Sequence, residues 1–181
     1  MRQVLKTKEK TLIAEKCSQH IQSGDSIFLD GSTTCWFVAR QLANKNLTVL
    51  TTSLQIATIL AASPTISLIL IGGAFSPKSM AFLGDNACRA LSNYYVDKAF
   101  ISCRSVSMEN GLTDVSEGEA AIHRLITQRS NRTYLVVDHS KVGPTSFAFA
   151  CGLDSIDAMI CDKPLPQEWQ DYLSGKNIAF Y

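Results

Sequence analysis

The chain has 181 residues, of which 46% are hydrophobic and 18% are charged, and its formal net charge is +1. A chain of this size can bury a sizeable core, so its composition predicts one folded domain and excludes the disordered class. A charge this close to neutral offers too little positive surface for strong nucleic-acid binding, which argues against DNA contact by these residues themselves.

Apolar runs rich in β-branched residues alternate with segments of helical period along the chain. This alternation predicts an α/β fold, with a mostly parallel open sheet and flanking helices. The first eight residues carry Arg2, Lys6 and Lys8 and are predicted to be the end of a linker, so that residues 9–181 form one domain. The predicted elements are, in chain order, helix 9–22, strand 26–29, helix 36–44, strand 47–50, helix 53–62, strand 66–71, helix 86–93, strand 98–102, helix 117–129, strand 133–137, strand 158–161, helix 164–174 and edge strand 178–181.

Three details of this pattern can be checked against the fold. The unbroken apolarity of 66–71 predicts a strand that is buried on both faces. A loop is predicted to follow it as far as residue 84, and the polar stretch 104–116 is predicted to be a second loop. Ser53 is predicted to cap the helix that follows strand 47–50.

The most distinctive local feature is the segment 30–34, which stands directly after a predicted strand and before a helix. Ligands of open α/β sheets collect at the carboxyl ends of strands, where hydroxyls, backbone N–H groups and a helix N-terminus favour phosphate. The alternative is a helix cap without a ligand, and this motif alone leaves both readings open. The candidate ligand residues here are Asp30, Gly31, Ser32, Thr33 and Thr34.

Other predicted strand ends carry the same kinds of residue. Several polar or glycine-rich ends on one edge of a sheet are what a polar small-molecule pocket requires, although each alone is more often a turn or cap. The candidates at these ends are Thr52, Ser53, Gly72, Gly73 and Lys141.

Five further residues are candidates for the same pocket. Lys78 could pair with phosphate, but a solvated surface position is favoured for it. Cys103 and Arg104 close the strand 98–102, where an exposed loop arginine is the alternative for Arg104. Glu119 is either a pocket residue or a favourable charge at a helix N-terminus. Gly84 ends the predicted loop.

The six cysteines lie far apart with no CxxC pair, which disfavours disulfides and structural zinc. His123 and His139 lack metal-ligand spacing, so surface or hydrogen-bonded roles are favoured for them. No secretion signal or bilayer-spanning run is recognisable. We therefore expect a cytoplasmic protein with free thiols and with no metal, cofactor or membrane partner.

A set of short segments along the chain resembles, in its order and spacing, the C-terminal sensor domain of the DeoR family of sugar-metabolism repressors, and it covers nearly the whole chain. The matching segments are 9–14, 27–34, 47–53, 70–73, 84, 96–100, 111–113, 119–120 and 138–141. The resemblance implies a fold similar to ribose-5-phosphate isomerase and the CoA transferases, which binds a phosphorylated sugar or sugar alcohol at the strand-end edge. It also implies a dimer or tetramer, and DNA binding through an N-terminal winged helix-turn-helix that these residues do not include.

The chain departs from the family pattern at two places. It has Ser102-Cys103-Arg104 where a Gly-Ala-Asp type segment is usual, and His123 where many members have lysine. These changes predict a different ligand preference, or, for Arg104, only a reshaped loop.

A sugar-phosphate isomerase on the same fold is the main alternative, since Asp30 is compatible with a carboxylate base. The acidic pair and Lys-Gly-rich loop of the isomerases that this sheet resembles are absent after residues 102 and 138. A CoA transferase would need an activated glutamate, and no glycine-rich loop surrounds Glu119. The sequence therefore favours a sensor without catalytic residues, in which effector binding reaches the DNA-binding domain through the helix 9–22.

Overall fold

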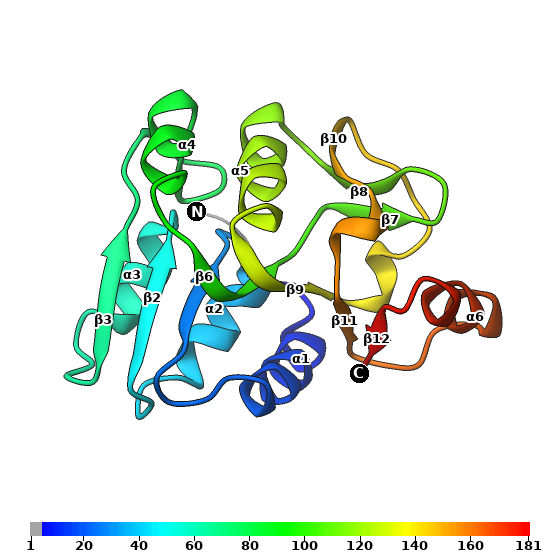
Figure 1. Ribbon diagram of the computed structural model, residues 1–181, viewed down its shortest axis with the longest axis horizontal. Coiled ribbons are helices and arrows are strands. Elements are labelled where there is room, and N and C mark those ends of the chain that lie inside the picture. The colour runs from blue at the N-terminus through cyan, green and yellow to red at the C-terminus, as the bar shows by residue number, and fades with distance from the viewer. Residues whose placement is uncertain (1–4) are drawn as a thin grey trace.

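Seven strands form one parallel sheet, which confirms the predicted α/β class. The computed structural model describes residues 5–181, so residues 1–4 of the predicted linker lie outside the described residues. The strand order is β12-β11-β9-β6-β1-β2-β3 (Figure 1). The strands are β1 Ser26–Leu29, β2 Leu47–Thr51, β3 Ile66–Leu70, β6 Val96–Ile101, β9 Ser130–Val137, β11 Ala158–Cys161 and β12 Ala179–Phe180.

Helices cover both faces of the sheet, and alternate strand residues point into two separate cores. Ile27 and Leu29 of β1 pack with α1 and α2, whereas Phe28 packs with residues of α4 and α5. The helices are α1 Thr7–Gln19, α2 Thr33–Arg40, α3 Leu54–Leu60, α4 Asp85–Leu91, α5 Glu117–Thr127 and α6 Gln167–Gly175, with short 3-10 turns η1 His139–Lys141 and η2 Leu153–Ser155.

Serine residues are the N-caps of three of the helices. Ser32 accepts a hydrogen bond from the backbone N–H of Cys35 at 3.1 Å at the start of α2, and Ser53 caps α3 as predicted. Ser116 accepts from the N–H of Glu119 at 3.3 Å at the start of α5. Each bond satisfies an N–H that has no partner inside its own helix.

The prediction of a fully buried strand at 66–71 was wrong. β3 is the edge strand of the sheet, and Leu70 is 38% exposed. Continuous apolarity does not distinguish an edge strand from a central one, because both contribute to the cores through the faces that the helices cover.

The predicted loop before residue 84 contains a short antiparallel hairpin of β4 (Ala74–Ser76) and β5 (Ala81–Leu83). The backbone N–H of Phe82 donates to the carbonyl of Thr52 at 2.8 Å, and Ala81 forms a bridge with Ser53. The hairpin is therefore held against the carboxyl end of β2.

The prediction of a loop at 104–116 was also wrong, because most of this stretch is a buried hairpin. β7 (Ser105–Ser107) pairs with β8 (Gly111–Asp114), and β10 (Ala148–Cys151) adds a third strand beside α5 (Figure 1). Polar residues can be buried here because they bond to one another: Ser105 Oγ lies 2.8 Å from Ser146 Oγ.

Gly111 is required by the contact between β8 and β10. Its φ is +63°, and a Cβ at this position would lie 2.4 Å from the carbonyl oxygen of Cys151. A side chain at residue 111 would therefore push β10 away from β8.

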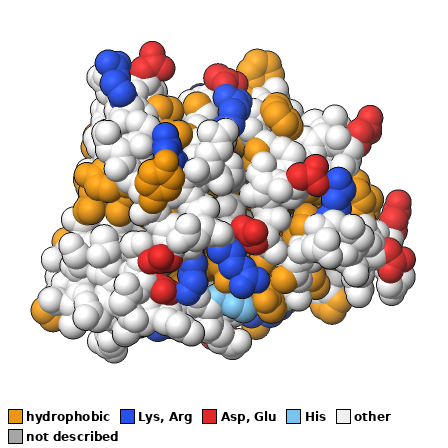
Figure 2. All heavy atoms as spheres, viewed as in Figure 1, with side chains coloured by type: hydrophobic (Ala, Val, Ile, Leu, Met, Phe, Trp, Pro, Cys, Tyr) orange, Lys and Arg blue, Asp and Glu red, His pale blue; other side chains and the backbone are white. Residues whose placement is uncertain are grey.

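All six cysteines are free, as predicted. No helix among residues 5–181 is long and apolar enough to cross a membrane. On the face shown in Figure 2, basic and acidic side chains are interspersed, in keeping with the net charge of +1.

Candidate functional site

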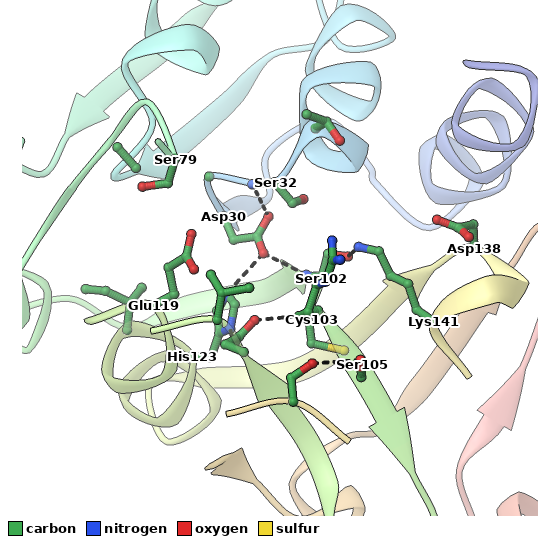
Figure 3. Close-up of a pocket in the computed structure, with 18 of the residues that line it drawn as sticks. Asp30, Ser32, Ser79, Ser102, Cys103, Ser105, Glu119, His123, Asp138 and Lys141 are labelled. Carbon is green, nitrogen blue, oxygen red and sulfur yellow. Dashed lines mark hydrogen bonds and ion pairs between the residues drawn. The ribbon is translucent and has the colours of Figure 1, made fainter. Parts of the chain in front are cut away.

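A cavity of about 550 Å³ opens at the carboxyl ends of the central strands. Asp30 follows β1, Thr52 follows β2, Ser102 follows β6 and Asp138 follows β9, and all four side chains line it. Figure 3 shows Asp138 and Lys141 at one end and Glu119 and Ser79 at the other, with Asp30 between them. The volume lies within the range of small-molecule sites.

The floor of the cavity is a buried ionic group of Asp30, His123 and Asp114. Asp30 Oδ2 lies 3.0 Å from His123 Nε2, and His123 Nδ1 lies 2.7 Å from Asp114 Oδ2. Asp30 also accepts from the backbone N–H groups of Ser32 at 3.0 Å and Ser102 at 2.7 Å. These contacts tie β1, α2, α5, β6 and β8 together at one point (Figure 3).

The charges of this group depend on one another. Burial alone would raise the pKa of Asp30, but its hydrogen bond and charge interaction with His123, together with the Ser32 and Ser102 bonds, lower it to about 2. Burial alone would lower the pKa of His123, but the charge and hydrogen bonds of Asp114 and Asp30 raise it to about 10. At neutral pH the imidazolium of His123 therefore lies between the carboxyl groups of Asp30 and Asp114 and is hydrogen-bonded to both.

Basic side chains from separate parts of the chain form the walls. Lys141 Nζ donates to Ser102 Oγ at 2.9 Å, and Lys6 Nζ lies 3.1 Å from Asp138 Oδ1. The remaining basic residues of the lining are Lys10 and Arg104. In the part of the chain that the structure describes, neither Lys141 nor Arg104 forms a side-chain ion pair with a carboxylate.

The structure brings nine of the fifteen predicted site residues together around the cavity. They are Asp30, Gly31, Ser32, Thr33, Thr52, Cys103, Arg104, Glu119 and Lys141. The other six do not line it and are Thr34, Ser53, Gly72, Gly73, Lys78 and Gly84.

Two of these six are buried elsewhere. Thr34 is fully buried in the first turn of α2, and the Ser53 hydroxyl is taken by the cap of α3. Both follow predicted strand ends, but only some of the positions after a strand face the ligand edge. The start of a helix directs the others into the core.

The other four have structural or surface positions. Gly73 packs closely, since a Cβ there would lie 2.7 Å from the Leu83 carbonyl oxygen, and Gly84 has a φ of +88° at the start of α4. Gly72 is exposed beyond the edge strand, and Lys78 is exposed, which was the favoured alternative for it.

Sequence reasoning missed several lining residues. His123 is hydrogen-bonded, as one of its alternatives predicted, but its partner Asp30 lies 93 positions away. Asp114 lay in the stretch predicted to be a loop, and Lys6 in the predicted linker. Asp138 and Ser140 lie in the polar strand end 138–141 that the sequence indicated. The missed lining residues with polar side chains are Lys6, Lys10, Ser79, Ser102, Ser105, Asp114, His123, Thr145 and Ser146.

Among residues 5–181, no group of three or more His, Cys, Asp and Glu side chains is placed to hold a metal ion. The cavity instead offers hydroxyls, backbone N–H groups and charges of both signs. Such a lining suits a small polar ligand that carries an anionic group.

A family model described as the DeoR C-terminal sensor domain matches residues 5–163. An uncharacterized HTH-type transcriptional regulator of Bacillus subtilis (strain 168), YulB, is 37% identical over 177 residues, which cover 98% of this chain and 69% of that protein. The glycerol-3-phosphate regulon repressor of Escherichia coli (strain K12) is 28% identical, over 98% of this chain and 71% of that protein.

The fold also resembles an enzyme of known structure. Ribose-5-phosphate isomerase A from Methanocaldococcus jannaschii aligns with a TM-score of 0.54 and 19% identity, over 74% of this chain and 53% of that one. At this identity the likeness concerns the fold alone, and it confirms the isomerase-like architecture that the sequence predicted.

Proposed function

Because the chain belongs to the family of DeoR C-terminal sensor domains, we propose that its strand-end cavity binds a phosphorylated sugar or sugar alcohol as an effector. Binding would change the affinity of the intact regulator for DNA. The relative named as a glycerol-3-phosphate regulon repressor supports a phosphorylated polyol as the chemical class.

One observation carries the proposal: Lys141 and Arg104 line the cavity, and neither forms a salt bridge with a carboxylate among the described residues. Asp30 and Asp114, by contrast, are already paired with His123. The cavity thus has positive charge available for a ligand anion, whereas two of its carboxylates are compensated.

The two ends of the cavity suit the two parts of such a ligand. Lys141, with the Ser32 and Thr33 hydroxyls at the start of α2, would bind the phosphate. Glu119 and Ser79 at the opposite end would accept and donate hydrogen bonds to sugar hydroxyls (Figure 3).

The floor group argues against the alternative of an isomerase. A general base works best with a pKa near the working pH, and the pKa of Asp30 is held at about 2. Both of its oxygens also accept hydrogen bonds from protein groups. Asp30 would therefore hold the residues around the cavity in position rather than abstract a proton.

The test is the thermal midpoint of the purified chain against millimolar phosphate esters of fructose, glucitol, galactitol, ribose and glycerol, each beside its unphosphorylated parent. A ligand at one hundred times its Kd stabilises the folded state by about 2.7 kcal/mol, or roughly 5–10 °C for a chain of this size. We expect such a rise with one phosphorylated compound and little with its parent.

Lys141→Ala should reduce this rise, and Lys78→Ala is the matched control, since Lys78 is exposed and outside the cavity lining. Equal shifts in the two variants would contradict the assigned phosphate end. No rise with any phosphate ester would contradict the proposed effector class, and conversion of the bound ester on long incubation would favour the isomerase.

A further inference from the structure

The segment that leads into α1 forms part of the cavity wall. Leu5, Lys6 and Lys10 all line the cavity, although they precede or begin the first helix. Lys6 is the N-cap residue of α1 and has left-handed backbone angles, with φ 57° and ψ 51°. Such angles are uncommon for a residue other than glycine, so surrounding contacts must hold this turn in place.

One side-chain contact braces the segment internally, and a second holds it on the cavity. Lys10 Nζ donates to the carbonyl oxygen of Leu5, and Lys6 Nζ pairs with Asp138 Oδ1 at 3.1 Å. The first contact lies within the segment. The second joins it to the carboxyl end of β9, which lies 132 positions further along the chain.

The Lys6–Asp138 pair joins a partly exposed ammonium to a buried carboxylate. The Asp138 side chain is 4% exposed and keeps two other donors, the N–H and the hydroxyl of Ser140. The Lys6 side chain is 34% exposed, and an ammonium on a flexible stem can turn to a new acceptor at little cost. Lys6 can therefore leave Asp138 without stranding a buried carboxylate.

We propose that Lys6 is an effector ligand supplied by the segment before α1, and that it exchanges Asp138 for the phosphate of a bound effector. This inference rests on the proposed function. A phosphate carries more negative charge than a carboxylate and offers more acceptor oxygens, so it competes well for the ammonium.

The exchange would give the sensor its output. In this family the sensor is the C-terminal domain, so the residues before α1 lead towards the rest of the regulator. A change of partner at Lys6 acts directly on the turn through which the chain enters α1. Effector binding would then favour one position of this segment, because the effector has a contact in that position that it lacks in the other.

The binding test compares four chains by calorimetric titration: wild type, Lys6→Ala, Lys8→Ala and Asp138→Asn. The probes are inorganic phosphate, the phosphate ester that gives the largest thermal shift, and its unphosphorylated parent. Lys8→Ala is the matched control because Lys8 lies two residues after Lys6, in the first turn of α1, and is exposed and outside the cavity lining.

We expect Lys6→Ala to weaken the ester about tenfold and the parent hardly at all, with Lys8→Ala near wild type. Asp138→Asn should strengthen the ester about threefold, because the amide still accepts from Ser140 but competes less for Lys6. If Lys6→Ala binds the ester as Lys8→Ala does, or weakens ester and parent equally, the proposal is overturned while the effector site stands. If the wild-type chain binds no phosphate ester, the proposed function itself fails.

Hydrogen exchange tests the output separately. The Lys10 N–H donates to the Lys6 carbonyl oxygen at 3.1 Å, so its exchange rate reports the turn that enters α1. We expect the ester to slow this exchange and Asp138→Asn alone to speed it, with the amides of α4 unchanged. If neither the ester nor Asp138→Asn changes the exchange rate of the Lys10 N–H, the proposed coupling between effector binding and this turn is overturned.

Discussion

The ionic group at the cavity floor and the Lys6–Asp138 pair at its rim use the same kinds of charge in different settings. At the floor, Asp30 is 2% exposed, and each charged side chain has at least two hydrogen-bonded partners from different elements. At the rim, Lys6 is 34% exposed, and its partner Asp138 is buried and bonds besides only to the neighbouring Ser140 among the described residues. The floor group is suited to holding the elements around the cavity in fixed positions, and the rim pair is suited to letting the segment before α1 move.

The largest effect should follow from breaking the floor group. His123→Ala leaves the buried Asp30 and Asp114 without their shared cation, and losing one partner of a buried pair costs about 3–5 kcal/mol. Urea unfolding measures the loss. His139→Ala is the control, because His139 pairs with Asp162 while 32% exposed, and we expect it to cost about 1 kcal/mol or less. Equal losses would mean that burial of the floor group is not what matters.

The next effect is a pH dependence of stability that the floor group should produce. The pKa of His123 is raised from 6.5 to about 10, so its contribution to stability is complete below about pH 6.5 and is lost as the pH rises through about 10. The pKa of Asp30 is lowered to about 2, so its contribution is present above about pH 3.8 and lost as the pH falls through about 2.

Denaturant unfolding of wild type and His123→Gln from pH 6 to 10.5 isolates the histidine. We expect the stability advantage of wild type to shrink steadily over this range. Parallel curves would show that His123 is not held as an imidazolium.

A smaller effect concerns how the floor histidine is positioned. Ser116 caps α5, the helix that carries Glu119 and His123, and loss of an N-cap costs about 1 kcal/mol. Ser116→Ala should therefore lower the free energy of unfolding by that amount, and Ser116→Thr should restore most of it. If threonine is no better than alanine, the hydroxyl is not acting as a cap.

The smallest effect on stability should come from the rim. Lys6→Ala removes a partly exposed ion pair, and such pairs contribute less than about 1 kcal/mol. The comparison is sharpest if this variant unfolds like Lys8→Ala yet loses effector affinity. A loss of several kcal/mol would place Lys6 among the residues that hold the fold.

The sequence predicted the parallel sheet because its strands are short β-branched runs separated by segments of helical period. It did not predict the β7–β8–β10 sheet. Ser105, Ser107 and Thr113 look like loop residues, and they are buried only because they bond to partners such as Thr145 and Ser146. Partners that far along the chain leave no periodic signal.

The site shows the same limit. Segment 30–34 could be predicted as a strand end that faces a ligand, but the role of His123 depends on Asp30 and Asp114, which come from other elements. The position of Lys6 depends likewise on Asp138. Residues beside a strand end are visible in sequence, whereas residues that reach the cavity from a helix face or a linker are not.

Gly111 bears on how the lining of the cavity could change while the fold is kept. Its contact with Cys151 fixes β10, and with it the lining residues Pro144, Thr145 and Ser146 just before that strand. The floor group needs none of these three residues. Changes in this stretch at positions such as Pro144 could therefore alter the ligand preference, as long as the hydrogen bonds of Thr145 and Ser146 to β7 and β8 are kept.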